Sequence, residues 1–132
     1  MLGIDTNVLV RILVEDDKAQ CARARRVVDM AIAKGEAVFV SLLVLLETEW
    51  VLRSRYRVAK PEIMDIVSRL LDSVELSFED EPAVEEALFH WRESSADFAD
   101  CLIGVRNRRL GCRATMTFDA KAARLAGYVS AS

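Results

Sequence analysis

The stretch Leu-Gly-Ile-Asp-Thr-Asn at residues 2–7 decides the expected fold, because it combines a short buried strand with a carboxylate at the point where a helix should begin. The strand leaves little polar surface before Asp5, and Thr6 and Asn7 are residues that favour a helix start. An acid at such a corner lies at the carboxyl edge of a sheet, where open α/β folds bind their ligands. Asp5 is therefore either a helix cap or a site residue, and the positions of the other acids decide between the two.

The composition is that of a single globular domain, with 132 residues of which 52% are hydrophobic and 30% charged. No apolar run approaches the length of about 18 residues that crosses a membrane, and the first strand follows Met1 without a signal peptide. We expect one domain over residues 1–132, in the cytoplasm and away from membranes. Three scattered cysteines and one histidine argue against a disulfide framework and a zinc site. The net charge of −3 argues against coating of nucleic acid by the overall field, but it allows a local basic groove.

Strands and helices alternate along the whole chain. The pattern predicts strands at residues 2–4, 37–41, 74–78, 114–118 and 128–130, and helices at residues 8–14, 18–34, 42–56, 60–73, 83–93, 97–110 and 120–125. Short links between alternating elements imply an α/β fold with a mostly parallel sheet covered by helices on both faces. The uniformly apolar second strand should be covered on both sides, whereas the alternating third strand should lie at an edge.

The helix at residues 42–56 carries two glutamates with different neighbours. Glu47 has apolar residues one turn before and one turn after it, which places it within an apolar stripe, whereas Glu49 stands four residues before Arg53 in the favourable order for an exposed ion pair. Burial of an ionised carboxylate among aliphatic side chains costs several kcal/mol unless a partner meets it. Glu47 is thus the glutamate that we expect to need a partner.

Two aspartates open a later helix, and a third follows a strand. Asp97 and Asp100 are three residues apart and share one helical face. Ser94 and Asp97 also fit a capping-box pattern, so a purely structural role for Asp97 stays open, while Asp100 lies deeper in the helix. Asp119 comes directly after the strand at residues 114–118, at the presumed carboxyl edge.

Carboxylates gathered at one edge without lysine or arginine would repel one another. A hard divalent cation resolves this repulsion, and oxygen-only ligands favour Mg²⁺ or Mn²⁺. Such a site suits phosphodiester hydrolysis, since the metal polarises the phosphoryl oxygen and lowers the pKa of bound water. The hypothesis requires Asp5, Glu47, Asp100 and Asp119 to converge.

The ordered set of these motifs resembles the PIN-domain ribonucleases and, more narrowly, the VapC-type toxins of toxin–antitoxin pairs. The resemblance rests on four segments that span nearly the whole chain: Ile-Asp-Thr-Asn at residues 4–7, residues 41–52 around Glu47, Asp-Phe-Ala-Asp at residues 97–100, and Thr-Phe-Asp at residues 117–119. It implies a three-layer α/β/α fold with a central, mostly parallel sheet of four to five strands in the order 3-2-1-4-5. It also implies a metal site at the carboxyl edge and RNA cleavage that leaves a 5′-phosphate.

By motif position, the resemblance makes Asp5, Glu47, Asp100 and Asp119 the catalytic and metal-binding acids, with Mg²⁺ as the cofactor and Mn²⁺ as a substitute. Further residues near the site are Asp97, Thr6, Asn7 and Thr117. The implied partners are an RNA substrate, a second copy of the chain in a homodimer, and a cognate antitoxin whose tail covers the acidic site.

Two other functions remain open. Another Mg²⁺-dependent phosphoryl hydrolase would share the α/β fold and edge aspartates, but the chain lacks an Asp-x-Asp after the first strand and a phosphate-binding lysine after an aspartate-ended third strand. A non-catalytic PIN-like interaction module would use the acids as helix caps only. The basic residues are either contacts for an RNA backbone or a solvated face, and they form two groups: Arg53, Arg55, Arg57 and Lys60, and Arg106, Arg108, Arg109 and Arg113.

Overall fold

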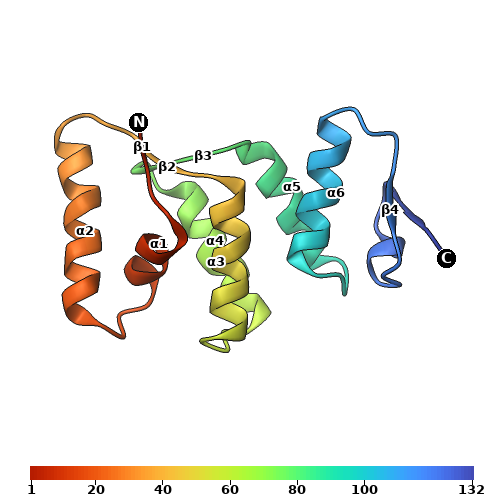
Figure 1. Cartoon of the computed structure of the whole chain (residues 1–132), viewed down its shortest axis with the longest axis horizontal. Helices are drawn as coiled ribbons and strands as arrows, with labels where there is room; N and C mark the ends of the chain where they lie inside the picture. The colour runs from red at the N-terminus through yellow and green to blue at the C-terminus, as the bar shows by residue number, and fades with distance from the viewer. The chain divides into compact units, whose positions relative to one another are not determined.

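The computed structural model describes residues 1–132 and contains six α-helices, five short strands and one 3-10 helix. It divides into two compact units, residues 1–79 and 80–132, which are described one at a time (Figure 1). The α/β class and the alternation of strands and helices are confirmed. The single domain expected over the whole length stays a prediction.

The first unit is built on a parallel sheet of three strands, in which β2 is the central strand. Val38 of β2 faces Leu2 of β1 on one side and Leu76 of β3 on the other. Val38 and Val40 are fully buried, and β3 lies at an edge, so both expectations for these strands are confirmed. The strands are β1 (Leu2–Gly3), β2 (Val38–Val40) and β3 (Leu76–Phe78).

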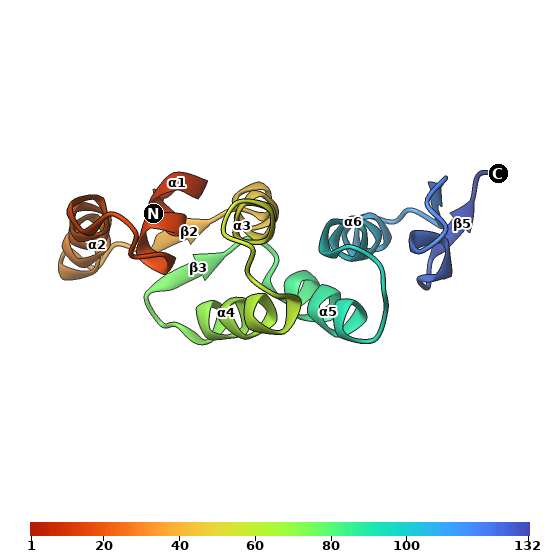
Figure 2. The ribbon, with the colours of Figure 1, turned by 90° about the horizontal axis from the view of Figure 1, so that it is seen from below.

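Four helices complete the first unit, and α1 packs against both α2 and α3 (Figure 2). Leu9 of α1 and Leu45 of α3 are almost completely buried, as are Leu52 of α3 and Ile63 of α4. Because α1 packs against both α2 and α3, the position of its first turn, which follows Asp5, is fixed within this unit. The helices are α1 (Thr6–Leu13), α2 (Lys18–Ala33), α3 (Leu42–Ser54) and α4 (Lys60–Asp72).

The second unit joins a helix pair to a two-stranded parallel sheet. Its helices α5 and α6 pack closely, with the rings of Trp91 and Phe98 centred 5.1 Å apart. β4 and β5 pair in parallel, with Thr115 opposite Tyr128. The elements are α5 (Glu81–Arg92), α6 (Phe98–Arg109), β4 (Thr115–Thr117), the 3-10 helix η1 (Ala122–Arg124) and β5 (Tyr128–Ser130).

The two sheets contain three of the four pairs in the expected strand order 3-2-1-4-5. β3 pairs with β2, β2 with β1, and β4 with β5, all of them parallel. The pairing of β1 with β4, which would join the two sheets, stays a prediction.

Helix ends fall close to where the sequence places glycine. Gly35 and Gly111 follow α2 and α6 with φ of 71° and 98°, a left-handed backbone that glycine adopts without steric cost. The helix expected at residues 120–125 is wrong in type and length, since only Ala122–Arg124 forms a 3-10 turn. The carboxylate of Asp119 accepts from the first free N–H groups of this segment, and Leu125 is already extended at φ −72° and ψ 145°, so the helical backbone ends after one 3-10 turn.

None of the helices combines the length and the apolar composition that a membrane span requires. The three cysteines are free thiols, with Cys101 buried and Cys112 exposed.

The two glutamates of α3 exchange the environments expected from the sequence. Glu49 is 3% exposed and pairs with Arg53 at 2.8 Å, whereas Glu47 is exposed. The buried side of α3 is set by Leu45, Thr48 and Leu52, and Glu49 falls on this side. The apolar stripe around Glu47 includes Leu43 and Trp50, which are exposed. Because α3 carries apolar residues on all sides, the spacing of apolar residues predicted the wrong buried face, the one that carries Glu47.

The buried pair predicts an asymmetry between its two members. We expect Arg53→Ala to lower the free energy of unfolding by about 2–3 kcal/mol, because it removes the cation beside a buried carboxylate. This is the low end for a broken buried pair, since Arg53 itself is 48% exposed. Glu49→Gln should cost about 1–2 kcal/mol, because the amide oxygen still accepts a hydrogen bond and Arg53 can be solvated. Urea unfolding at neutral pH measures both, and a larger loss for Glu49→Gln would contradict the assignment of Glu49 as the buried partner.

Candidate functional site

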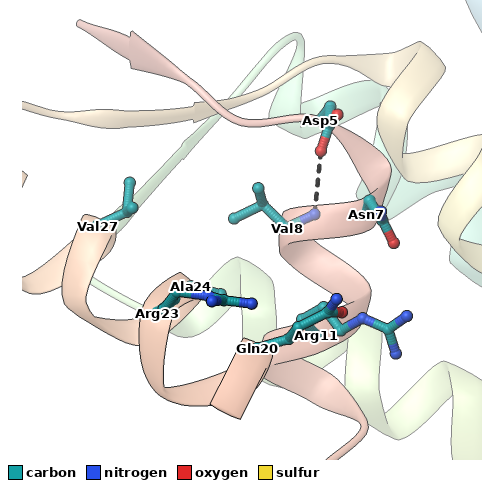
Figure 3. A pocket seen from close by; sticks show the side chains of 8 residues that line it. All are labelled: Asp5, Asn7, Val8, Arg11, Gln20, Arg23, Ala24 and Val27. Atoms are coloured by element: carbon teal, nitrogen blue, oxygen red, sulfur yellow. Dashed lines mark hydrogen bonds between the residues drawn. The ribbon is translucent and has the colours of Figure 1, made fainter. Parts of the chain in front are cut away.

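Asp5 stands where β1 ends and α1 begins, as the sequence predicts. It is exposed, and its Oδ1 accepts a hydrogen bond from the backbone N–H of Val8 at 3.0 Å (Figure 3). The helix-cap role is therefore real. The bond uses one carboxylate oxygen, so Oδ2 remains able to bind a ligand. Asn7, in the first turn of α1, is also exposed.

Thr6 connects Asp5 to Glu47. Its buried side chain donates from Oγ1 to Glu47 Oε1 at 2.5 Å, across 41 residues of sequence. Glu47 therefore has a partner within the protein, the hydroxyl of Thr6. This bond ties the middle of α3 to the start of α1 and holds Glu47 against the residue that follows Asp5. Within the first unit, the structure brings together Asp5, Thr6 and Glu47.

The second unit gathers the other three acids. Asp97 is the residue before α6, and Asp100 lies in the first turn of that helix. Burial raises the pKa of the Asp100 carboxyl, and the negative charges of Asp119 and Asp97 raise it further. Asp97 is exposed and makes no capping bond with its side chain. The N-cap of α6 is Asp97 and not Ser94, so the alternative of a capping box that starts at Ser94 does not hold.

Asp119 is held by a tight turn after β4. Its Oδ1 accepts from the backbone N–H groups of Lys121 at 2.8 Å and Ala122 at 2.9 Å, while its own N–H donates to Thr117 Oγ1 at 3.0 Å. Thr117 thus fixes the turn that carries Asp119. As with Asp5, one carboxylate oxygen is bonded to the backbone and the other takes no part in these bonds.

Tyr128 is a residue near this cluster that the sequence did not single out. Its hydroxyl donates to the backbone carbonyl of Asp100 at 2.6 Å, and burial followed by the Asp100 charge raises the pKa of Tyr128 to about 12. Its ring lies against Gly104, where a Cβ would meet ring atom Cε2 at 2.5 Å. The one signal in the sequence was a glycine in the interior of a helix, which indicates close approach of another group.

The contact between Tyr128 and Gly104 allows a test of whether Tyr128 holds the backbone at Asp100. Gly104→Ala should push the Tyr128 ring away and break its bond to Asp100, and overpacking of this kind costs about 1–3 kcal/mol. The helix propensity of alanine offsets up to about 1 kcal/mol of that cost. We expect a net loss of stability in thermal unfolding. The matched change Gly3→Ala meets no atom within 4 Å and should cost less; equal losses would contradict the role of Tyr128.

The charges around Asp100 suit a cation. Besides burial, which has the largest effect, the groups that raise its pKa are the carboxylates of Asp119 and Asp97. Oxygen-only donors fit Mg²⁺ or Mn²⁺, and Mg²⁺ commonly uses one or two protein carboxylates together with waters. No group of three or more His, Cys, Asp or Glu side chains is arranged so that it could hold a metal ion. The donors fit the metal by their chemistry.

The chain is similar to a known protein family over nearly its whole length. The PIN domain model matches residues 3–128, nearly the whole chain and both of its units. The chain belongs to the PIN domain family. A VapC ribonuclease from Aquifex aeolicus (strain VF5) is 26% identical to this PIN domain over 116 residues, which cover 87% of this chain and 84% of the relative.

Most of the basic residues near the end of α6 are engaged within the second unit. Arg106 and Arg109 both pair with Asp80, at 3.2 Å and 2.7 Å, and Arg108 pairs with Glu86. The hydrogen bond from Arg109, helped by the charges of both arginines, lowers the pKa of Asp80. These arginines tie α6 to the start and middle of α5, which is a structural role in this PIN domain.

Proposed function

We propose that this PIN domain is a metal-dependent endoribonuclease and the toxin of a VapBC-type toxin–antitoxin pair. The observation that carries the proposal is the partly buried Asp100, whose neighbouring charges Asp119 and Asp97 are of the same sign. Such an arrangement is costly unless a cation joins it. The match to the PIN domain family and the similarity to a VapC ribonuclease support the reaction class.

In this proposal, Asp5, Glu47, Asp100 and Asp119 hold Mg²⁺, for which Mn²⁺ can substitute. The bound metal supplies an activated water and stabilises charge on the phosphate. Thr6 fixes the position of Glu47 through its 2.5 Å hydrogen bond, and Thr117 fixes the turn of Asp119 through its own bond at 3.0 Å. Tyr128 holds the backbone at Asp100, and Asp97 and Asn7 lie beside the ligands as neighbours of the site.

The proposal includes the partners that the VapC-type resemblance implies. RNA is the substrate, a second copy of the chain forms a homodimer, and a cognate antitoxin inhibits the enzyme in the cytoplasm. Expression of the protein alone should arrest growth, and coexpression of the product of the neighbouring open reading frame should relieve the arrest. Sequencing of the RNA ends formed soon after induction would then identify the cleaved RNA.

Cleavage of purified RNA tests the reaction itself. We expect cleavage with Mg²⁺ or Mn²⁺, none with EDTA, and new ends that carry a 5′-phosphate. Asp72→Asn is the matched control, because Asp72 is an exposed acid at the end of α4 and outside the proposed site. Cleavage that persists in EDTA, or that is equal in Asp5→Asn and wild-type preparations, would refute the proposal. Metal binding without any cleavage would instead indicate an interaction module.

A further inference from the structure

A pocket of about 310 Å³ opens between α1 and α2 in the first unit, with Asp5 at one side (Figure 3). This volume lies at the low end for small-molecule sites, which span about 300–1,000 Å³, and so admits one group of nucleoside size. Val8 contributes apolar surface from α1, and Ala24 and Val27 contribute it from α2. The pocket was not indicated by the acidic motifs of the sequence.

Polar residues from both helices also line the pocket. Gln20 and Arg23 reach from α2 toward α1, and the lining on α1 includes Asn7 and Arg11, whose side-chain ends point away from α2 (Figure 3). Amide groups present a donor and an acceptor side by side, as the edges of nucleic acid bases do. Guanidinium planes stack on unpaired bases and bind phosphate. Together with the apolar surface, these groups match the chemistry of a nucleotide better than that of a peptide.

Arg23 is the positive charge of the pocket that has no partner. It is exposed and makes no ion pair or hydrogen bond in the structure, whereas Arg11 is paired with Asp16 at 2.9 Å. A phosphate beside Arg23 would therefore meet an unpaired guanidinium, while Asp5 lies at the side of the pocket.

Arg11 is fixed in place at the pocket by an ion pair. Its Nη1 binds Asp16 at 2.9 Å, and Asp16 in turn accepts from the Tyr56 hydroxyl at 3.0 Å. Arg11 therefore forms a rigid part of the pocket wall and leaves Arg23 as the unpaired cation of the pocket.

We propose that this pocket binds one unpaired nucleotide of the RNA strand next to the cleaved phosphate. The inference rests on the proposed ribonuclease function, because Asp5 is shared between the pocket and the proposed metal ligands. Arg23 contacts the phosphate or stacks on the base, and Gln20 contacts the base edge. The base must leave its stack to enter, so the site selects single-stranded RNA.

Binding of RNA can be measured without cleavage, in the Asp100→Asn background, with a fluorescent single-stranded RNA of mixed sequence as the probe. Arg23→Gln should weaken binding at least about fivefold and reduce the salt dependence of the affinity by about one charge. Arg26→Gln is the matched control, since Arg26 is exposed on the same helix but does not line the pocket. Equal weakening by the two variants would overturn the proposal, because it would reflect overall charge only.

Base preference gives the second readout. A randomised RNA pool cut by the wild type should show a preference at one position beside the cut, and Gln20→Ala should flatten it while Asp72→Asn leaves it intact. An unchanged preference would overturn the proposal. So would a variant Arg23→Gln that binds RNA normally but loses affinity for the antitoxin, since the occupant would then be protein. If the wild type cuts no RNA under any condition, the proposed function fails, whereas the binding experiment still tests the pocket.

Discussion

Replacement of Asp100 by asparagine should abolish RNA cleavage and, in the metal-free protein, stabilise the fold at neutral pH. Loss of a metal ligand should reduce kcat by more than about 100-fold, because even residues that only orient a ligand typically contribute about 10–100-fold. The gain in stability follows from the raised pKa of Asp100, which shows that the folded state disfavours its charged form. The variant removes a partly buried charge that faces Asp119 and Asp97.

The pH dependence of this gain has a definite sign. A carboxyl whose pKa is higher in the folded state than in the unfolded state destabilises the fold when it is ionised. The advantage of Asp100→Asn over the wild type should therefore be full above the folded pKa of Asp100. It should decrease as the pH falls through that pKa and vanish below the ordinary value of 3.8. Thermal unfolding in EDTA across this pH range measures it.

Added Mg²⁺ should reverse the order of stability, because the wild type binds the cation through Asp100 and the variant does not. Asp72→Asn, a change of the same chemistry outside the site, should show neither the gain nor the reversal. An Asp100→Asn protein that is less stable than the wild type in EDTA, or that still cleaves RNA at the wild-type rate, would contradict the assignment.

Glu47→Gln and Glu49→Gln, two identical changes on one helix, should separate catalysis from stability. Glu47→Gln should reduce cleavage by more than about 100-fold, because Glu47 is a proposed metal ligand. It should change the free energy of unfolding little, because Glu47 is exposed and an amide oxygen can still accept the bond from Thr6. Glu49 is buried and paired with Arg53, so its loss should lower stability by about 1–2 kcal/mol and leave kcat within a few-fold of the wild type.

Kinetics and urea unfolding on the same preparations decide this comparison. Thr6→Val adds a check on positioning, because it removes the hydroxyl that holds Glu47 and keeps the carboxylate. It should weaken Mn²⁺ affinity by about 10–100-fold, as loss of a supporting hydrogen bond does, and added Mn²⁺ should restore part of the activity. A wild-type rate in Glu47→Gln, with the loss of activity in Glu49→Gln instead, would show that the metal ligand is the other glutamate.

The sequence was sufficient for the order of the elements and, apart from the segment at residues 120–125, for their type. The caps and glycines that bound the helices, such as Asp5 before α1 and Gly35 after α2, act locally, and the structure keeps them. The parallel pairing around β2 also followed from the pattern, because an apolar strand between two crossovers has to be covered on both sides. Local signals of this kind survive in the fold because tertiary packing does not oppose them.

The environment of single side chains could not be read so reliably. On α3, apolar residues surround the whole helix, so the buried face depends on which neighbours pack against it, and Glu49 is buried instead of Glu47. The bond from Thr6 to Glu47 spans 41 residues and leaves no local trace in the sequence. The bond from Tyr128 to Asp100 is of the same kind, since Gly104 indicated a close contact but not its partner.

The most direct test of the central claim is titration of Mn²⁺ into the metal-free protein by calorimetry, with the wild type, Asp5→Asn, Asp100→Asn and the control Asp72→Asn. The claim is that acids from both halves of the sequence bind one metal site. It predicts that Asp5→Asn and Asp100→Asn each weaken the same single binding event, while Asp72→Asn leaves it unchanged. Wild-type binding in both single variants, or two independent sites lost one at a time, would contradict it.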